Sequence, residues 1–309
     1  MARSRGGRAI ASEIVGGSVA QGDQLRAGPA AVMSKGVSRS FISAPVLALC
    51  APAAIVLATA LADAARAQPA AAPDPCAAGH GPAVAIEAVT DAGDIRLSDG
   101  RLGRLADLDL GRDAISAGAW PGHVAAIRKA LVGLTVTADE DGGFPDRWGR
   151  RPFRLSLAGD SETAHRLLAA RGLARIAPLG EQEACAISLL PLEAAARAQK
   201  AGLWREPAAR ALGAGEAPAI RAMAGRFALV EGKVVSVGER PRRIYLNFGR
   251  DFQRDFVATL SPKTARHLEK AGISPSSLRG KTVRVRGVIV LRRAPAIEIT
   301  GPVQIEVVR

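Results

Sequence analysis

Residues Asp146-Arg147-Trp148-Gly149-Arg150 lie midway along the first folded region and lead directly into a stretch, 151–157, whose apolar residues alternate as in a strand. A guanidinium is a permanently charged planar fork that matches the geometry of phosphate. An aromatic residue and a glycine between arginines, at the start of a strand, would hold Arg150 out from a rigid sheet edge. For this pentapeptide alone, a loop with solvated arginines is the favoured interpretation. The neighbouring segments decide between the two.

Short strands and amphipathic helices surround this turn. Apolar residues at helical spacing from Trp120 to Leu131 predict a helix with one buried face. Asp99-Gly100 predicts a hairpin turn that brings Asp94 beside Arg104. The strands that we expect are 84–89, 94–97, 101–110, 134–138 and 151–157. The later helices that we expect are one capped by Asp160-Ser161 that ends at Gly172, one over 181–189, and one that Pro191 opens over 192–201.

Residues 82–206 resemble the thermonuclease, or staphylococcal nuclease-like, family, because several motifs occur in the order typical of that domain. These motifs are Gly93-Asp94, Asp99-Gly100, Arg104-Leu105 with Asp109, residues 146–150, residues 168–175 (Leu-Ala-Ala-Arg-Gly-Leu-Ala-Arg), residues 193–197 (Glu-Ala-Ala-Ala-Arg) and Gly202-Leu203-Trp204. The resemblance implies a five-stranded OB barrel with three packed helices. It also implies calcium-dependent cleavage of phosphodiester bonds in DNA and RNA.

Such chemistry needs oxygen ligands for calcium, arginines that offset the charge on phosphate, and a carboxylate that assists the attacking water. The resemblance implies Asp94 and Asp109 as the metal ligands, and Arg104 and Arg150 as the catalytic phosphate contacts. The alternative is that these four side chains form a charge network that holds the barrel rim and catalyses nothing.

The chain departs from the family pattern where the water-assisting glutamate is expected, three positions after Asp109. The stretch there is Asp109-Leu110-Gly111-Arg112, so an arginine replaces the glutamate. Asp113 is the catalytic candidate that remains, provided that the loop is remodelled. Two smaller departures are an extra residue, Ala92, and Ile95 in place of a threonine.

An Ala/Gly/Pro-rich stretch, 207–221, predicts a linker, and residues 222–309 predict a second domain. Its expected strands are 227–237, 243–248, 255–260, 282–291, 297–300 and 303–308, with a helix over 263–271. A helix between the third and fourth strands is the order of an OB fold. This segment resembles OB-type nucleic-acid-binding domains.

The positive charge of the chain is concentrated in this segment. The net charge is +13 overall, and residues 218–309 hold 18 Lys/Arg against 7 Asp/Glu. Basic residues interleaved with aromatics are typical of single-strand binding, although the alternative is that the rings fill the barrel and the arginines are solvated. The predicted nucleic-acid-binding residues are Arg242, Arg243, Tyr245, Arg250, Arg254, Lys281, Arg284 and Arg286. Alternation places Ile244, Leu246 and Phe248 inward and Tyr245 outward. We expect DNA or RNA as the partner, without sequence specificity.

The N-terminal region predicts export. Residues 1–32 show no periodicity, and translation starts at either Met1 or Met33. Residues 33–67 combine basic residues, an apolar run and a small-residue cleavage site, which is typical of a signal peptide. We therefore expect a periplasmic or secreted protein with no transmembrane segment after cleavage, and a linker over 68–81. The alternative is an uncleaved membrane anchor.

Three cysteines are present, and Cys50 lies inside the signal peptide. Cys76 and Cys185 remain as an even pair in an oxidising compartment, which favours a disulfide over two buried free thiols. The four histidines are scattered, so no zinc site is expected.

The expected fold is mainly β with α (α+β), with two OB barrels in tandem, the first of staphylococcal nuclease-like type with packed helices. One functional hypothesis is a secreted calcium-dependent phosphodiesterase. The second is a non-catalytic envelope protein that binds nucleic acid or another polyanion through a degenerate nuclease domain. A third is a structural envelope protein whose basic domain meets anionic surface polymers or lipid headgroups.

Overall fold

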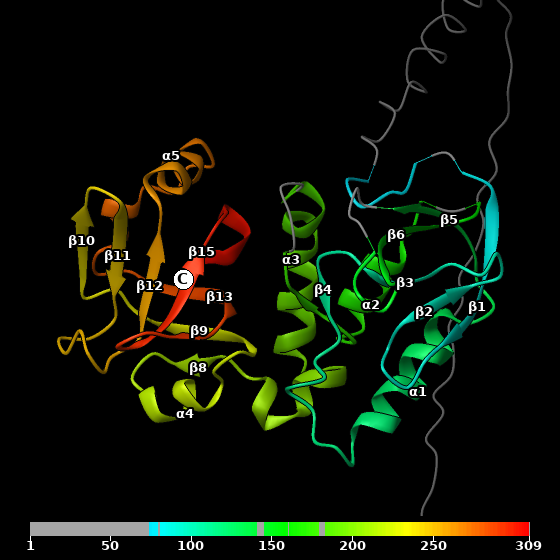
Figure 1. Cartoon of the computed structure of the whole chain (residues 1–309), viewed down its shortest axis with the longest axis horizontal. Helices are drawn as coiled ribbons and strands as arrows, with labels where there is room; N and C mark the ends of the chain where they lie inside the picture. Colours follow the sequence, from blue (N-terminus) through cyan, green and yellow to red (C-terminus); the bar gives the residue numbers. More distant parts are fainter. Residues whose placement is uncertain (1–73, 80, 141–144, 160, 179–182, 309) are drawn as a thin grey trace, which may run out of the picture. The chain divides into compact units, whose positions relative to one another are not determined.

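A computed structural model describes residues 74–308 apart from 80, 141–144, 160 and 179–182 (Figure 1). The predicted signal peptide and half of the expected linker over 68–81 lie outside the described residues. The described part is mixed α+β and mostly strands, which confirms the predicted class.

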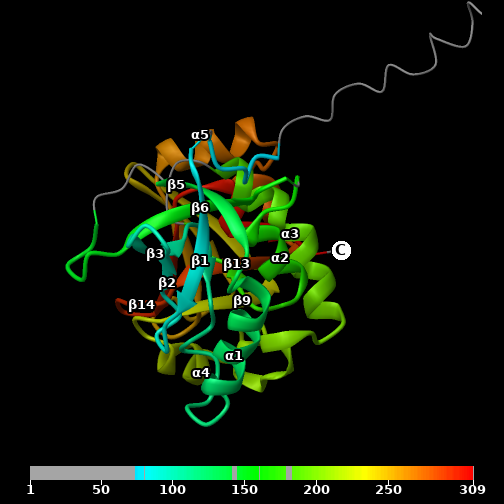
Figure 2. The same cartoon turned by 90° about the vertical axis from the view of Figure 1, so that its right-hand side faces the viewer.

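The first region is a closed barrel in the order β1-β2-β3-β6-β5, which Figure 2 shows nearest the viewer. Its strands are β1 (Ala83–Val89), β2 (Ile95–Leu97), β3 (Leu102–Leu105), β5 (Thr135–Glu140) and β6 (Arg151–Leu157). β3 and β6 are parallel, and the other pairs are antiparallel. A separate short pair joins β4 (Leu108–Asp109) to β7 (Arg175–Ile176).

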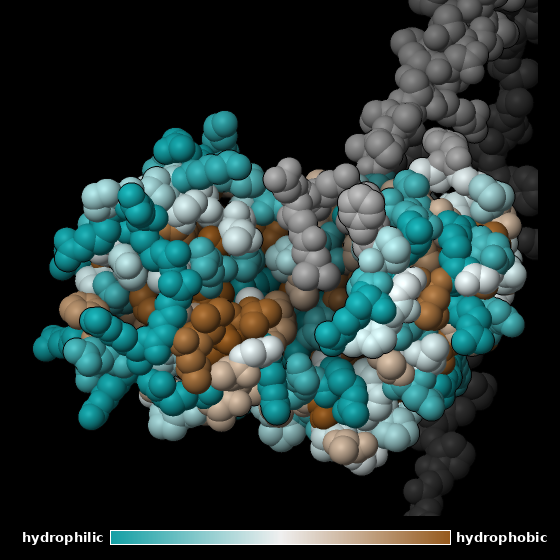
Figure 3. All heavy atoms as spheres, viewed as in Figure 1, coloured by the Kyte–Doolittle hydropathy of each residue, from teal (hydrophilic) through white to brown (hydrophobic). Residues whose placement is uncertain are grey.

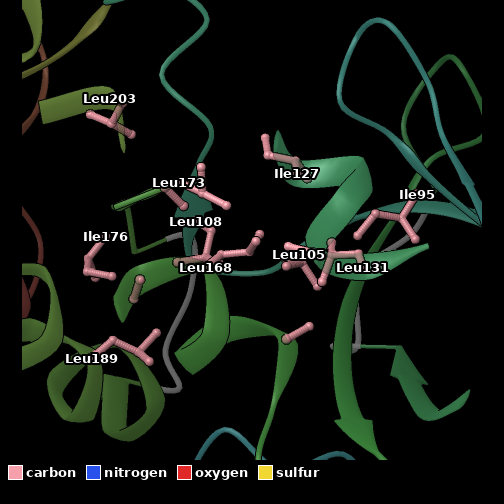
Figure 4. Packing of buried hydrophobic residues seen from close by; sticks show 14 of the residues in the cluster. Ile95, Leu105, Leu108, Ile127, Leu131, Leu168, Leu173, Ile176, Leu189 and Leu203 are labelled. Carbon is pink, nitrogen blue, oxygen red and sulfur yellow. The ribbon is translucent and has the colours of Figure 1, made fainter. Parts of the chain in front are cut away.

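Helices α1 (Trp120–Leu131), α2 (Ala164–Ala170) and α3 (Glu183–Ala198) pack on this barrel. The apolar face predicted for α1 is confirmed, because Trp120, Val124, Ile127 and Leu131 are all buried. Leucines and isoleucines from α1, α2, α3 and the strands meet in one core (Figure 4).

Three local expectations were wrong. The N-cap of α2 is Thr163, whose hydroxyl accepts from the backbone N of Arg166, and not the Asp160-Ser161 pair. Pro191 lies inside α3, which continues through it instead of beginning again. The expected strand 101–110 is interrupted at Asp107, whose φ of 58° turns the chain from β3 into β4.

The C-terminal region contains two sheets, in the orders β10-β11-β12-β15-β14 and β16-β13-β9-β8. The strands are β8 (Leu212–Gly213), β9 (Phe227–Lys233), β10 (Ser236–Arg240), β11 (Arg243–Asn247), β12 (Val257–Leu260), β13 (Thr282–Val288), β14 (Val290–Leu291), β15 (Pro295–Ile299) and β16 (Ile305–Val307). The helix between β12 and β13 is α5 (Pro262–Lys270), and short 3-10 turns lie at η3 (Pro275–Leu278) and η4 (Pro302–Gln304). Two expected long strands are each divided between the sheets: 227–237 falls on β9 and the start of β10, and 282–291 falls on β13 and β14.

The stretch expected as a flexible linker, 207–221, carries ordered elements. Turns η1 (Gly202–Arg205) and η2 (Pro207–Ala209) precede β8, which pairs with β9, and α4 (Ala217–Ala222) follows. Ile220 and Ala209 are fully buried. Small residues here allow close packing, which the composition alone did not distinguish from flexibility.

The predicted disulfide is present between Cys76 and Cys185. It joins the segment before β1 to the first turn of α3 across 109 residues of sequence.

A buried ion cluster connects β13 to α3 and β7. Arg286 is fully buried and bonds through one terminal nitrogen to Glu193 Oε2, at 2.8 Å, and to Glu306. Its other terminal nitrogen donates to the carbonyl of Ile176 at 3.0 Å and to Glu193 Oε1 at 3.1 Å. Glu193 is itself fully buried, and it also accepts from the backbone N of Ile176 at 2.8 Å. Arg197 also pairs with Glu193, at 3.3 Å, so two guanidiniums and one backbone N–H satisfy this buried carboxylate.

Arg286→Ala should lower the free energy of unfolding by about 3–5 kcal/mol, because it removes the fully buried cation that pairs with the fully buried carboxylate of Glu193. Urea unfolding monitored by circular dichroism measures the change. The matched control is Arg242→Ala, which removes an exposed arginine and should cost less than about 0.5 kcal/mol. Equal effects of the two substitutions would show that the buried cluster contributes nothing.

Removing the disulfide with Cys76→Ala and Cys185→Ala should also destabilise the fold, by about 4–5 kcal/mol, because the bond closes a long loop in the unfolded chain. The same urea titration measures the loss. In the wild type, alkylation without reductant should leave both thiols unlabelled in mass spectrometry. Labelling of either cysteine in the native protein would contradict the pairing.

Candidate functional site

The structure brings three of the predicted site residues together at one edge of the barrel. Asp94 lies directly before β2, Arg104 is on β3, and Arg150 directly precedes β6, which pairs with β3. Arg104 Nε is 2.5 Å from Asp94 Oδ1, and Arg150 Nη1 is 3.5 Å from the same oxygen. One carboxylate therefore holds both guanidinium groups that the resemblance identified as phosphate contacts.

The turn over 146–150 is held together by hydrogen bonds to the Asp146 carboxylate. Asp146 Oδ1 accepts from the backbone N of Trp148 at 2.9 Å and of Arg150 at 3.0 Å. Asp146 Oδ2 accepts from Arg150 Nε at 2.7 Å. The hydrogen bond from Arg150 lowers the pKa of Asp146 to about 2, and the same bond raises the pKa of Arg150. The ring of Trp148 is 59% exposed and lies against the guanidiniums of Arg147 and Arg150, at 3.8 and 4.5 Å.

Asp109 is held separately from Asp94, by a residue to which the sequence analysis gave no role. Arg175 lies opposite Asp109 in the β4–β7 pair, and it donates to Asp109 Oδ2 through Nε, at 2.8 Å, and through Nη2. The backbone N of Gly111 donates to Oδ1 at 3.2 Å. Arg175 is 1% exposed and lies over the ring of Phe227, 5.0 Å away. The only sequence signal for Arg175 was its place at the end of the 168–175 motif.

Arg112 and Asp113 are exposed in the turn after β4. They line one cavity together with Arg104 and Asp109. The guanidinium of Arg112 lies 5.0 Å from the ring of Trp120. The position expected for a carboxylate therefore holds a cation stacked on an aromatic ring, and Asp113 shares the cavity as the candidate base.

These side chains do not fit a calcium centre. Calcium takes six to eight oxygen ligands, mostly from carboxylates that are free to coordinate. Asp94 is hydrogen-bonded to Arg104, and both oxygens of Asp109 accept hydrogen bonds. Among the described residues there is no group of three or more Asp, Glu, His or Cys side chains placed to hold a metal. No catalytic step is therefore assigned to calcium.

A second hollow, of about 770 Å³, lies on the C-terminal sheet β10-β11-β12-β15-β14. Four arginines line it: Arg240 and Arg243 flank the β10–β11 turn, and Arg292 and Arg293 precede β15. Tyr245, Asn247, Val257 and Thr259 form its floor, and Phe252, which is 65% exposed, lies at its rim. The predicted outward direction of Tyr245 is confirmed, because Leu246 is fully buried and Ile244 and Phe248 pack on the core.

The charge of this hollow is positive. Glu298 lies 3.6 Å from both Arg243 and Arg292, and Glu239 is the acidic residue in the lining. For Arg240 and Arg293, no ion pair is formed within the described part of the chain. Hydrophilic side chains dominate the β10–β11 side of the surface (Figure 3).

The remaining predicted nucleic-acid-binding residues are distributed differently. Arg242, Arg250, Arg254 and Lys281 are exposed. Arg286 was wrongly placed on the surface, because it belongs to the buried cluster with Glu193. The side chain of Arg284 is 14% exposed and pairs with Glu231 at 2.7 Å. Both arginines face inward at the junction with α3, and strand alternation within β13 gave no sign of the acidic partner there.

No protein-family model and no curated protein matches this sequence. None of the described helices is long and apolar enough to cross a membrane.

Millimolar calcium should leave the melting temperature of the purified protein unchanged, because the two predicted ligands are already paired with arginines. A ligand that binds the folded state at well above its dissociation constant raises stability measurably. Thermal unfolding with calcium chloride, with magnesium chloride and with EDTA makes the comparison. A rise in melting temperature that only calcium causes, and that Asp94→Asn abolishes, would show that calcium binds at Asp94.

Proposed function

We propose that this chain is an exported protein that binds single-stranded nucleic acid, without sequence specificity, through the hollow on the C-terminal sheet. The observation that carries the proposal is the cluster of Arg240, Arg243, Arg292 and Arg293 around the ring of Tyr245. Arginines contact backbone phosphates, and an aromatic ring stacks on a base of any sequence. Export is supported by the disulfide, since such bonds persist in oxidising compartments.

The strand order supports the finer proposal of two OB folds in tandem. In the first region the order is β1-β2-β3-β6-β5, with β3 and β6 parallel. In the second, β10, β11 and β12 form a meander, β12 pairs in parallel with β15, and β13 returns to β9. If β9–β10 and β13–β14 are each one bent strand, the two regions have the same order, with α5 before the fourth strand.

This assignment favours the hollow as the binding face. OB folds bind oligonucleotides on the face of strands 2 and 3 and on the loops between strands 1 and 2 and between strands 4 and 5. In the proposed numbering, Tyr245 is on strand 2 and Thr259 is on strand 3. Arg243 lies next to the first of these loops, and Arg292 and Arg293 lie in the second.

Phosphodiester hydrolysis at the first barrel is the second candidate, and one observation favours it. Arg104 and Arg150 converge on Asp94 as the thermonuclease resemblance implies. The pairing of Asp109 with Arg175 and the arginine at position 112 oppose it. We therefore propose a nuclease-like barrel with a degenerate site, joined to a domain that binds nucleic acid.

Replacing Arg240 and Arg293 by Glu should weaken binding of a fluorescent oligothymidylate by at least about 100-fold, because two attractive interactions with phosphate become repulsive. Fluorescence anisotropy over a series of salt concentrations measures the affinity. It also gives the salt slope, which is the steepness with which the logarithm of the binding constant falls with the logarithm of the salt concentration. The slope should fall by about 0.7 for each phosphate that the variant no longer neutralises. Tyr245→Ala should weaken the binding free energy by about 1–3 kcal/mol, because a base loses its stacking partner, and it should change the salt slope less.

The matched control replaces Arg266 and Arg279 by Glu, which changes the net charge equally at exposed positions outside the hollow. If this control weakens binding as much as the Arg240/Arg293 pair, binding depends on overall charge and the hollow has no special role. A parallel incubation with plasmid and calcium tests the second candidate. Nicking that Arg150→Ala abolishes would favour hydrolysis.

A further inference from the structure

A cavity of about 490 Å³ lies beside the rim cluster of the first barrel, apart from the hollow on the C-terminal sheet. Its inner wall is formed by the barrel core, with side chains from β2, β3, α1 and α2. In Figure 4 the core residues that line it are Ile95, Leu105, Leu108, Ile127, Leu131 and Leu168. This volume and this predominantly apolar lining are typical of sites for small organic molecules.

Polar groups are confined to one part of the lining. They are Arg104, Asp109, Arg112 and Asp113. Arg104 uses Nε for Asp94, and no described residue accepts from its two terminal nitrogens. Arg112 stacks on Trp120 and forms no ion pair with any described residue.

The two carboxylates of the lining, Asp109 and Asp113, repel a bound anion only weakly, each for a different reason. Arg175 neutralises Asp109 from outside the cavity, so this carboxylate contributes little repulsion. Asp113 is exposed next to Arg112, where water screens its charge. The cavity therefore presents two guanidiniums with free donors beside an apolar wall, and guanidinium donors match carboxylate, sulfonate and phosphate oxygens.

We propose that this cavity binds a small organic acid with an apolar body, independently of calcium. The acidic group lies between Arg104 and Arg112, and the apolar body lies along Leu110, Trp120 and the core wall. The arginine at position 112, which removes the family's carboxylate, supplies the charge for this ligand. The inference does not depend on nucleic-acid binding by the C-terminal domain.

The probe for the experiment is 8-anilinonaphthalene-1-sulfonate, an aromatic sulfonate whose fluorescence rises in apolar surroundings. We expect one probe molecule to bind per chain, with the same affinity in calcium and in EDTA. Octanoate should displace it, whereas octanol, which has the same chain without the acid, should be at least about ten-fold weaker because it lacks the charged hydrogen bonds.

Two variants place the probe in this cavity. Arg112→Glu should weaken binding about ten-fold or more, and Ala92→Trp, at an exposed position of the lining, should block it by bulk. Arg147→Glu is the matched control, since it makes the same charge change on an exposed arginine outside the cavity. It should leave probe binding unchanged. Circular dichroism melts verify that each variant folds.

The outcomes separate this proposal from the proposed function. Replacing Arg240 and Arg293 by Glu should leave probe binding unchanged while it weakens oligothymidylate binding, so either proposal can fail alone. Unchanged binding in both folded cavity variants would place the probe elsewhere and overturn the inference. Equal displacement by octanol and octanoate would overturn the charged recognition, and a calcium requirement would overturn the metal-independent site.

Discussion

The buried contact of Arg286 with Glu193 is the constraint on which the arrangement of the described chain depends. Both side chains are fully buried, one on β13 and the other on α3, 93 residues apart in sequence. Moving two charges out of water costs several kcal/mol for each ion unless they are paired and hydrogen-bonded. The strand and the helix are therefore held in one relative position, because any other position leaves a charge unsatisfied.

This constraint extends to the rim of the first barrel through β7. Glu193 and Arg286 bind the backbone N and carbonyl of Ile176, and the preceding residue, Arg175, pairs with Asp109. Phe227, at the start of β9, lies against the guanidinium of Arg175. Residues of the C-terminal region thus support the partner of a predicted calcium ligand. The electrostatics of the first barrel therefore depend on residues of the C-terminal region.

The two candidate surfaces differ in whether their charges are already paired. At the barrel rim, Asp94 and Asp109 are both bonded to arginines, which leaves little negative charge for a cation. On the C-terminal sheet, four arginines share few acidic neighbours around one exposed face. An unpaired, solvated cation gains most from a phosphate, because it loses no existing partner on binding. This contrast favours binding over hydrolysis.

Local patterns in the sequence determined the mixed α+β class, the amphipathic helix α1 and the outward direction of Tyr245. Each depends on neighbours a few residues apart, which periodicity and turn chemistry report directly. The sequence also indicated the pairing of Cys76 with Cys185, because only these two cysteines lie outside the predicted signal peptide. Only the tertiary structure decided that Arg286 is buried and that Asp109 belongs to Arg175. The Asp109–Arg175 pair joins residues 66 positions apart, and the Glu193–Arg286 pair joins residues 93 positions apart. A charged residue in a strand has the same local sequence pattern whether it contacts water or a buried carboxylate.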